Sequence, residues 1–218
     1  MSRTLPSSMT PSGKAVSSKK DVPAQARRQF RRTRRALAGS EQHDNALAVS
    51  RIVARSPLLF GTGAIGLYFA NITDGELDTL PLMNRLWAMS KTIAVPVVAP
   101  NHPTMDFYRL TDVTNLVRNR FGILEPAPGS SFLNPLRFSL MFLPLVSFDD
   151  HGNRMGMGLG FYDRYLGRIT PRLRPRLIGL AHEVQHSRKL LERKPWDVPL
   201  DGVITEAGWR SFGQRFMV

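Results

Sequence analysis

The sequence predicts a three-layer α/β protein, in which a mostly parallel sheet carries helices on both faces. An apolar run at residues 64–70 is followed by an amphipathic segment at 80–90 and a second apolar run at 93–98. Strand, helix and strand with short joins form a right-handed unit with parallel strands. The apolar runs at 139–148 and 177–181 are nearly continuous. Such runs are expected of strands that are buried on both faces.

Length and composition favour one domain and exclude several kinds of site. We predict a disordered basic tail at residues 1–20, rich in Ser, Pro and Lys, and a single α/β domain at 21–218. The chain has no cysteine, which excludes disulfides, zinc–thiolate sites and a thiol nucleophile. No apolar run reaches membrane-spanning length, and no secretory signal is evident. We therefore expect a cytoplasmic protein that does not enter a membrane, and we expect a monomer.

The net charge of +13 invites a nucleic-acid partner, but its distribution argues against one. Residues 1–40 hold ten Lys or Arg and one acid, whereas residues 41–218 hold twenty and sixteen. The charge is therefore concentrated in an N-terminal arm, and such arms are usually solvated. Nucleic-acid binding through this arm remains a less favoured alternative, which salt-sensitive binding lost on deleting residues 1–38 would reveal.

Two helices are predicted ahead of the first strand. Residues 24–37 carry a narrow apolar stripe among many arginines, and Gly39 ends this segment. Residues 43–56 form a second amphipathic segment, which Pro57 stops. The basic face of the first helix is either simply solvated, or one of its arginines folds back onto an anionic ligand.

The later elements are shorter. Alternation over residues 105–110 predicts a strand at an edge of the sheet. Residues 121–126 are expected to form a loop that begins with an aromatic residue, and residues 202–205 a short last strand. No internal repeat is present.

The chain is organised around the segment at residues 148–166. A polar turn and three alternating glycines follow the apolar run, and helical spacing resumes after Gly160. Strand, glycine loop and helix start together direct backbone N–H groups toward a phosphate. Arg154 would add guanidinium donors, and Asp163 would be placed to hold Mg²⁺. A glycine turn that only packs helix on strand remains an alternative, because the glycine pattern alone is weak.

The full string Arg-x-Gly-x-Gly-x-Gly-aromatic-Tyr-Asp-Arg, at residues 154–164, closely resembles the signature of 5-formyltetrahydrofolate cyclo-ligases, also called 5,10-methenyltetrahydrofolate synthetases. Other landmarks of that family recur in order over about residues 25–206, including Gly75-Glu76-Leu77-Asp78-Thr79, Phe121-Gly122-Ile123-Leu124-Glu125-Pro126 and Trp196-Asp197. The resemblance implies a Rossmann-like sheet, similar to the NagB/RpiA/CoA-transferase-like fold.

The resemblance also implies a reaction. With ATP and Mg²⁺, 5-formyltetrahydrofolate would be cyclised to 5,10-methenyltetrahydrofolate, with release of ADP and phosphate. ATP would phosphorylate the formyl oxygen, which converts a poor leaving group into phosphate, and N10 would then attack the activated carbon. Another ATP or sugar-phosphate enzyme on a related sheet is the alternative, and folate-dependent ATP turnover would separate the two.

Roles follow for individual residues. The catalytic residues implied are Glu76, Arg154 and Asp163, and Mg²⁺ would be held by Asp163 together with Asp197. Those implied for the ATP phosphates and their loop are Arg28, Arg154, Gly156, Gly158, Gly160, Phe161 and Tyr162. Those implied for the folate are Phe69, Glu76, Phe121, Ile123 and Tyr162. The family's first helix carries Lys-x-x-x-Arg, and here Ala24 stands in the lysine position, which Arg27 or Arg31 could replace.

Overall fold

The computed structural model describes residues 21–213, so the predicted tail at residues 1–20 lies outside the described part. A seven-stranded sheet in the order β11-β10-β9-β6-β1-β2-β3 runs through the middle of the molecule. The five central strands pair in parallel, and the strands at the two edges pair antiparallel. The strands are β1 (Ala64–Gly66), β2 (Ile93–Val98), β3 (Met105–Leu110), β6 (Phe138–Pro144), β9 (Arg176–Leu180), β10 (Gly202–Thr205) and β11 (Gly208–Ser211).

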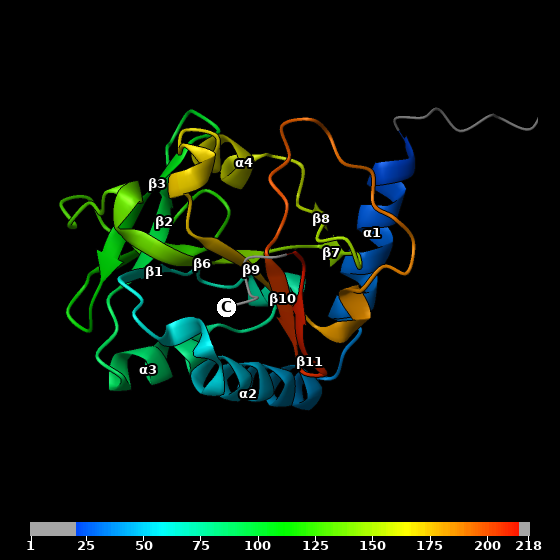
Figure 1. Cartoon of the computed structure of the whole chain (residues 1–218), viewed down its shortest axis with the longest axis horizontal. Coiled ribbons are helices and arrows are strands. Elements are labelled where there is room, and N and C mark those ends of the chain that lie inside the picture. The colour runs from blue at the N-terminus through cyan, green and yellow to red at the C-terminus, as the bar shows by residue number, and fades with distance from the viewer. Residues whose placement is uncertain (1–20, 214–218) are drawn as a thin grey trace, which may run out of the picture.

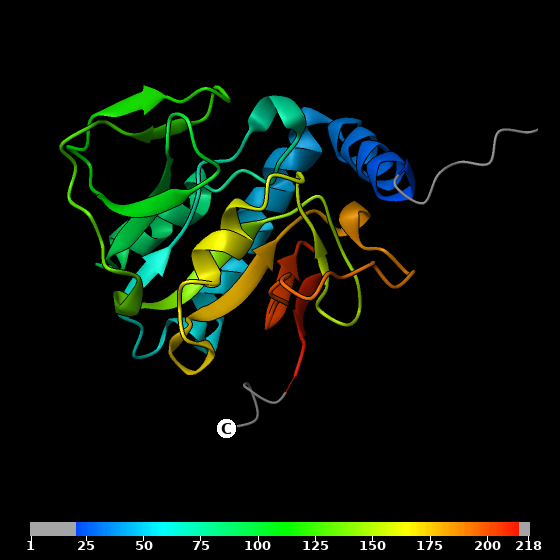
Figure 2. The ribbon, with the colours of Figure 1, turned by 90° about the horizontal axis from the view of Figure 1, so that it is seen from above.

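Helices cover both faces of this sheet. Within residues 21–213 the α-helices are α1 (Asp21–Arg35), α2 (Gly39–Arg55), α3 (Leu80–Ala88) and α4 (Phe161–Leu166). In Figure 1, α2 and α3 lie below the sheet and α4 lies above it, whereas α1 stands at one end of the molecule. Figure 2 shows the same layers from above, with the sheet crossing over α2. The predicted three-layer α/β fold with a mostly parallel sheet is confirmed.

Two hydrophobic cores explain why the central strands are apolar along their whole length. On β6, Leu140 and Phe142 belong to the core under α2 and α3, whereas Met141 and Leu143 belong to the core under α4. All four side chains are fully buried. Because successive residues of a strand point to opposite faces, a sheet covered on both faces needs apolar residues at both parities.

The predicted strand at residues 139–148 is interrupted in the structure. After β6 the chain leaves the sheet, and β7 (Ser147–Phe148) pairs with β8 (Arg154–Met155) in a small hairpin. The carbonyl of Leu145 accepts hydrogen bonds from Arg34 and Gln185. Side chains therefore satisfy this polar backbone in place of a neighbouring strand, as burial requires.

Other differences are local. Residues 121–126, expected to be a loop, contain β5 (Leu124–Pro126), which forms a hairpin with β4 (Leu116–Arg118). The Asn119 side chain accepts from two backbone N–H groups in its turn, those of Phe121 and Ile123. The strand expected at 64–70 ends at Gly66, although the chain stays buried through Tyr68. The sequence did not predict β11.

Candidate active site

The segments that follow the central parallel strands gather at one edge of the sheet, because the carboxyl ends of parallel strands meet there. These segments are residues 67–76 after β1, 99–104 after β2, 145–160 after β6 and 181–187 after β9. They are joined by hydrogen bonds, such as that from the Ser147 hydroxyl to the Gln185 carbonyl at 2.8 Å. Helix α1 packs against the same edge, touching the short helices η2 (Ile72–Asp74) and η5 (Glu183–Gln185).

The glycine loop at residues 156–160 presents free backbone donors at this edge. Gly158 and Gly160 have φ angles of +95° and +65°, a left-handed conformation that favours glycine. Within residues 21–213, none of the N–H groups of residues 156–160 donates a hydrogen bond to another residue. Helix α4 begins directly after the loop. The loop therefore has the unpaired amides that an anion requires.

Arg27 is the arginine of α1 that reaches this loop. Its Nε donates to the carbonyl of Gly156 at 2.8 Å, and its guanidinium lies about 3.5 Å from where a Cβ on Gly158 would stand. Arg31, one turn further along the same face, is bound to Asp74 instead. Arg28 is exposed. Arg27 therefore faces the loop and the predicted Arg28 does not, because adjacent helical residues point about 100° apart. Which of these arginines binds phosphate stays a prediction.

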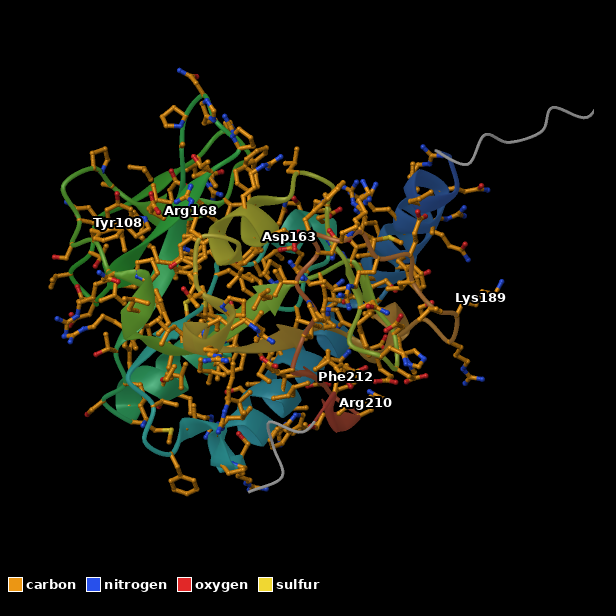
Figure 3. The ribbon with its side chains drawn as sticks, turned by 45° about the horizontal axis from the view of Figure 1, so that its top comes forward. Tyr108, Asp163, Arg168, Lys189, Arg210 and Phe212 are labelled. Carbon is orange, nitrogen blue, oxygen red and sulfur yellow. The ribbon has the colours of Figure 1, made fainter. Side chains whose placement is uncertain are left out.

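Arg154 and Asp163 form one unit that connects three segments. Arg154 Nη2 donates to Asp163 Oδ1 at 2.6 Å, and Arg154 Nη1 donates to the Val198 carbonyl. The Val198 N–H in turn donates to Asp163 Oδ1 at 3.2 Å. The Arg154 side chain is only 6% exposed, so it is not a solvated turn residue. Figure 3 shows Asp163 on α4, near the centre of the molecule.

The donor set near Asp163 fits Mg²⁺ in one way. Asp163 Oδ2 remains available beside the Arg154 ion pair, and Asp197 adjoins Val198 but accepts through Oδ2 from the Lys194 N–H at 2.8 Å. In the described residues, no group of three or more His, Cys, Asp or Glu could form a complete protein cage. Mg²⁺ commonly takes one or two carboxylates and completes its shell with phosphate oxygens and water. Asp163 and Asp197 are compatible with that mode.

Glu76 lies beyond the glycine loop, after η2, in a largely buried position. Its Oε2 accepts from the Asn71 N–H at 3.0 Å, and its Oε1 lies 3.4 Å from Nη2 of Arg34. Burial raises the pKa of Glu76, and the charge of Arg34 opposes that rise. Burial also raises the pKa of Tyr162, and the charges of Glu76 and Arg154 both act on this phenol. The Tyr162 phenol is therefore within electrostatic reach of both Glu76 and Arg154.

The apolar residues predicted for the folate divide between the two faces of the sheet. Phe121 and Phe161 meet edge to face, with ring centroids 6.0 Å apart, and Phe121 is 40% exposed. Ile123 closes the same turn through its N–H bond to Asn119. Phe161 and Tyr162 pack on the α4 side, whereas Phe69 packs against the α2 and α3 core. Phe69 thus packs on the opposite face of the sheet from Phe161 and Tyr162, and the folate roles of these residues stay predictions.

Sequence reasoning missed two residues of this site, Arg34 and Asp74. Both are buried, and Arg34 Nη2 is 2.5 Å from Asp74 Oδ2. Arg34 is one of six arginines in α1, and no spacing in the sequence distinguishes it from the others. Asp74 carried no signal either, because its partners lie about forty residues earlier in the chain.

These features define a class: α/β proteins with an anion-receptive glycine loop and a buried carboxylate at the carboxyl edge of a parallel sheet. Within that class, the chain belongs to the 5-formyltetrahydrofolate cyclo-ligase family, whose sequence model matches residues 19–206. The predicted family is thus confirmed.

Individual relatives agree with this assignment. The 5-formyltetrahydrofolate cyclo-ligase of Escherichia coli K12 is 37% identical over 180 residues, covering 81% of this chain and 96% of the relative. That of Haemophilus influenzae is 35% identical over 184 residues, covering 83% and 95%. The NMR structure of Aquifex aeolicus 5,10-methenyltetrahydrofolate synthetase matches with a TM-score of 0.75 at 27% identity, over 88% of this chain and 94% of that one.

None of the described helices is long and apolar enough to cross a membrane.

Proposed function

We propose that this protein cyclises 5-formyltetrahydrofolate to 5,10-methenyltetrahydrofolate at the expense of ATP, with Mg²⁺ bound at Asp163. The observation that carries the proposal is the glycine loop, whose free N–H groups are flanked by Arg27 and Arg154 and lie on the same sheet edge as Glu76. One end of the site is thus suited to phosphate, and the other carries a buried carboxylate.

At the phosphate end, the amides of residues 156–160 would hold the triphosphate together with the two guanidinium groups. Charge-assisted bonds of this kind are short and strong, and they gain strength as charge moves in the transition state. When bound at Asp163, Mg²⁺ would supply additional positive charge on the phosphate oxygens. The terminal phosphoryl group would then pass to the formyl oxygen, which leaves ADP.

At the folate end, Glu76 would face the N5 and N10 region, and the aromatic side chains of Phe121, Phe161 and Tyr162 would hold the rings. N10 attacks the activated carbon, the bond from that carbon to the phosphorylated oxygen breaks, and phosphate departs. N10 gives up its proton, for which the Glu76 carboxylate is the acceptor, and the product carries a positive charge shared by N5 and N10. A carboxylate beside this charge stabilises both the transition state and the product.

The direct test supplies 5-formyltetrahydrofolate, ATP and Mg²⁺ to the purified protein and follows the absorbance of the methenyl product. We expect product only when all three are present, with one ADP formed per product. ATP turnover that is indifferent to the folate would instead indicate another ATP or sugar-phosphate enzyme on this sheet. Absence of both product and ATP turnover would overturn the proposal.

A further inference from the structure

We infer that Arg34 is a positioning residue for the reaction: it fixes the orientation of Glu76 and keeps this buried carboxylate ionised. The inference rests on the proposed role of Glu76 and adds a residue that neither the motif nor the glycine loop contains. Arg34 lies in α1, forty-two residues before Glu76 in the chain.

The guanidinium of Arg34 is held from three directions. Its Nε donates to the Asp74 carbonyl at 2.8 Å, and its Nη1 donates to the Leu145 carbonyl at 3.0 Å. Its Nη2 lies 2.5 Å from Asp74 Oδ2 and 3.4 Å from Glu76 Oε1. The side chain is fully buried. A planar fork that is bound to backbone at two corners cannot turn away from the carboxylates.

The electrostatics around Glu76 require such a cation. Burial disfavours its charged form, and the negative charge of Asp74 acts in the same direction. Tyr68 and Tyr162, which also face Glu76, are neutral phenols whose pKa values burial raises further. The remaining groups that act on these phenols are Arg154 and Tyr165 near Tyr162 and Asp78 near Tyr68. His182 lies near Arg34.

His182 does not supply the missing charge. Its side chain is fully buried, and burial, followed by the charge of Arg34, lowers its pKa to about 4. Arg34 is therefore the cation that opposes the raised pKa of Glu76, with the Asn71 N–H as the second stabilising contact. Both oxygens of Glu76 keep a lone pair free for the substrate.

Docking of α1 alone would not need Arg34 in this place. Asp74 is already paired with Arg31, which donates from Nη2 to Oδ1 at 2.8 Å, and with Arg35. Arg31 and Arg35 are 29% and 48% exposed, whereas Arg34 is the arginine turned inward to Glu76. The chain thus offers a matched pair, because Arg31 and Arg34 share Asp74 but only Arg34 contacts Glu76.

The experiment compares kcat as a function of pH for Arg34→Met and Arg31→Met in the full chain, using 5-formyltetrahydrofolate and ATP at saturation. Without the Arg34 charge the pKa of Glu76 rises, so we expect the acid limb of the kcat profile to move upward by at least one pH unit. We expect the acid limb of Arg31→Met to stay within about 0.3 unit of the parent. An unshifted limb in a folded Arg34→Met protein would overturn the inference.

Two further variants keep the test decisive. Arg34→Lys retains the charge without the planar fork, so its acid limb should return to the parental pH while its kcat stays several-fold below that of the parent. If Arg34→Met does not fold, a parental kcat in Arg34→Lys would overturn the inference. Glu76→Gln examines the proposed function separately. If Glu76→Gln keeps the parental kcat, the proposed role of Glu76 is wrong. If Glu76→Gln loses most of its kcat but the acid limb of Arg34→Met is not shifted, only the inference about Arg34 is wrong.

Discussion

The guanidinium of Arg154 has two roles. It binds Asp163 and the Val198 carbonyl, and it would also contact the phosphates. The ion pair orients the guanidinium beside the glycine loop, and such bidentate surroundings are what distinguish arginine from lysine. Asp163 correspondingly has two candidate partners, Arg154 and a metal ion. The pair is largely buried, so its charges are screened less than those of surface pairs.

We expect Arg154→Met to raise the KM for ATP or lower kcat at least tenfold, since a lost charge-assisted contact is worth roughly 1.5–3 kcal/mol. Arg154→Lys should recover only part of this loss. The control is Arg168→Met, which breaks the exposed pair with Asp106 at 3.1 Å just after α4 and should leave both constants unchanged. Steady-state kinetics with varied ATP measures both constants. A parental kcat and KM for ATP in Arg154→Met would show that Arg154 does not bind the phosphates.

His182 makes a second prediction at this scale, about acid stability. Burial and the charge of Arg34 lower its pKa from 6.5 to about 4. Between these values the unfolded chain takes up a proton that the folded chain refuses, so the free energy of unfolding falls as pH falls through this window. Near pH 4 this lowers the free energy of unfolding by about 3 kcal/mol.

Urea unfolding of the parent and of His182→Gln at pH 7.5, 5.5 and 4.5 measures this contribution. We expect the gap in unfolding free energy between the two proteins to narrow steadily as pH falls. The pKa values of some carboxylates, such as Asp149 and Glu183, are lowered in the folded protein. Their contribution to the free energy of unfolding is lost at still lower pH, and equally in both proteins. A gap that does not change with pH would show that His182 titrates normally.

At the scale of elements, α1 is attached to the sheet edge through its arginines. Arg31, Arg34 and Arg35 all pair with Asp74. Burial alone would raise the pKa of Asp74, but the hydrogen bonds and charges of Arg31 and Arg34 lower it. Since this docking fixes the phase of the helix, it also decides which arginine one turn earlier faces the glycine loop.

The two adjacent arginines of α1 allow a matched test of that phase. Arg27→Met should raise the KM for ATP several-fold, because it removes the donor to Gly156 and the positive charge over Gly158. Arg28→Met removes the same charge from the exposed face and should leave the KM for ATP within about twofold. Equal effects of the two changes on the KM for ATP would mean that only the general charge of the helix matters. In that case the difference between each variant and the parent would shrink equally as salt is added.

At the scale of the whole molecule, the chemistry lies at the carboxyl edge of one sheet that is stabilised by cores on both faces. The family match begins at residue 19 and the described domain at Asp21. We therefore expect deletion of residues 1–18 to leave the melting temperature within about 2 °C, and turnover within about twofold, of the full chain. Calorimetry and the cyclisation assay measure these, and a large loss of either would assign the N-terminal residues a part in folding or catalysis.

The sequence by itself determined the fold class, the family and the position of the glycine loop. Double-sided burial requires continuous apolar strands, and a loop with positive φ angles requires glycines, so both constraints are written into local patterns. The strands at Ile93–Val98, Met105–Leu110 and Gly202–Thr205 were predicted with these bounds, the second from its alternation rather than from a continuous apolar run.

Only the tertiary structure decided which charged groups meet. Arg27 and Gly156 are 129 residues apart, and Arg34 and Glu76 are 42 apart, so no local period relates them. The hairpin at β7 and β8 also depended on distant partners, because Arg34 and Gln185 bind the Leu145 carbonyl where the strand ends. A helix with six arginines can present any of them to the sheet, and packing on the Asp74 carboxylate selects the one rotation that buries Arg34.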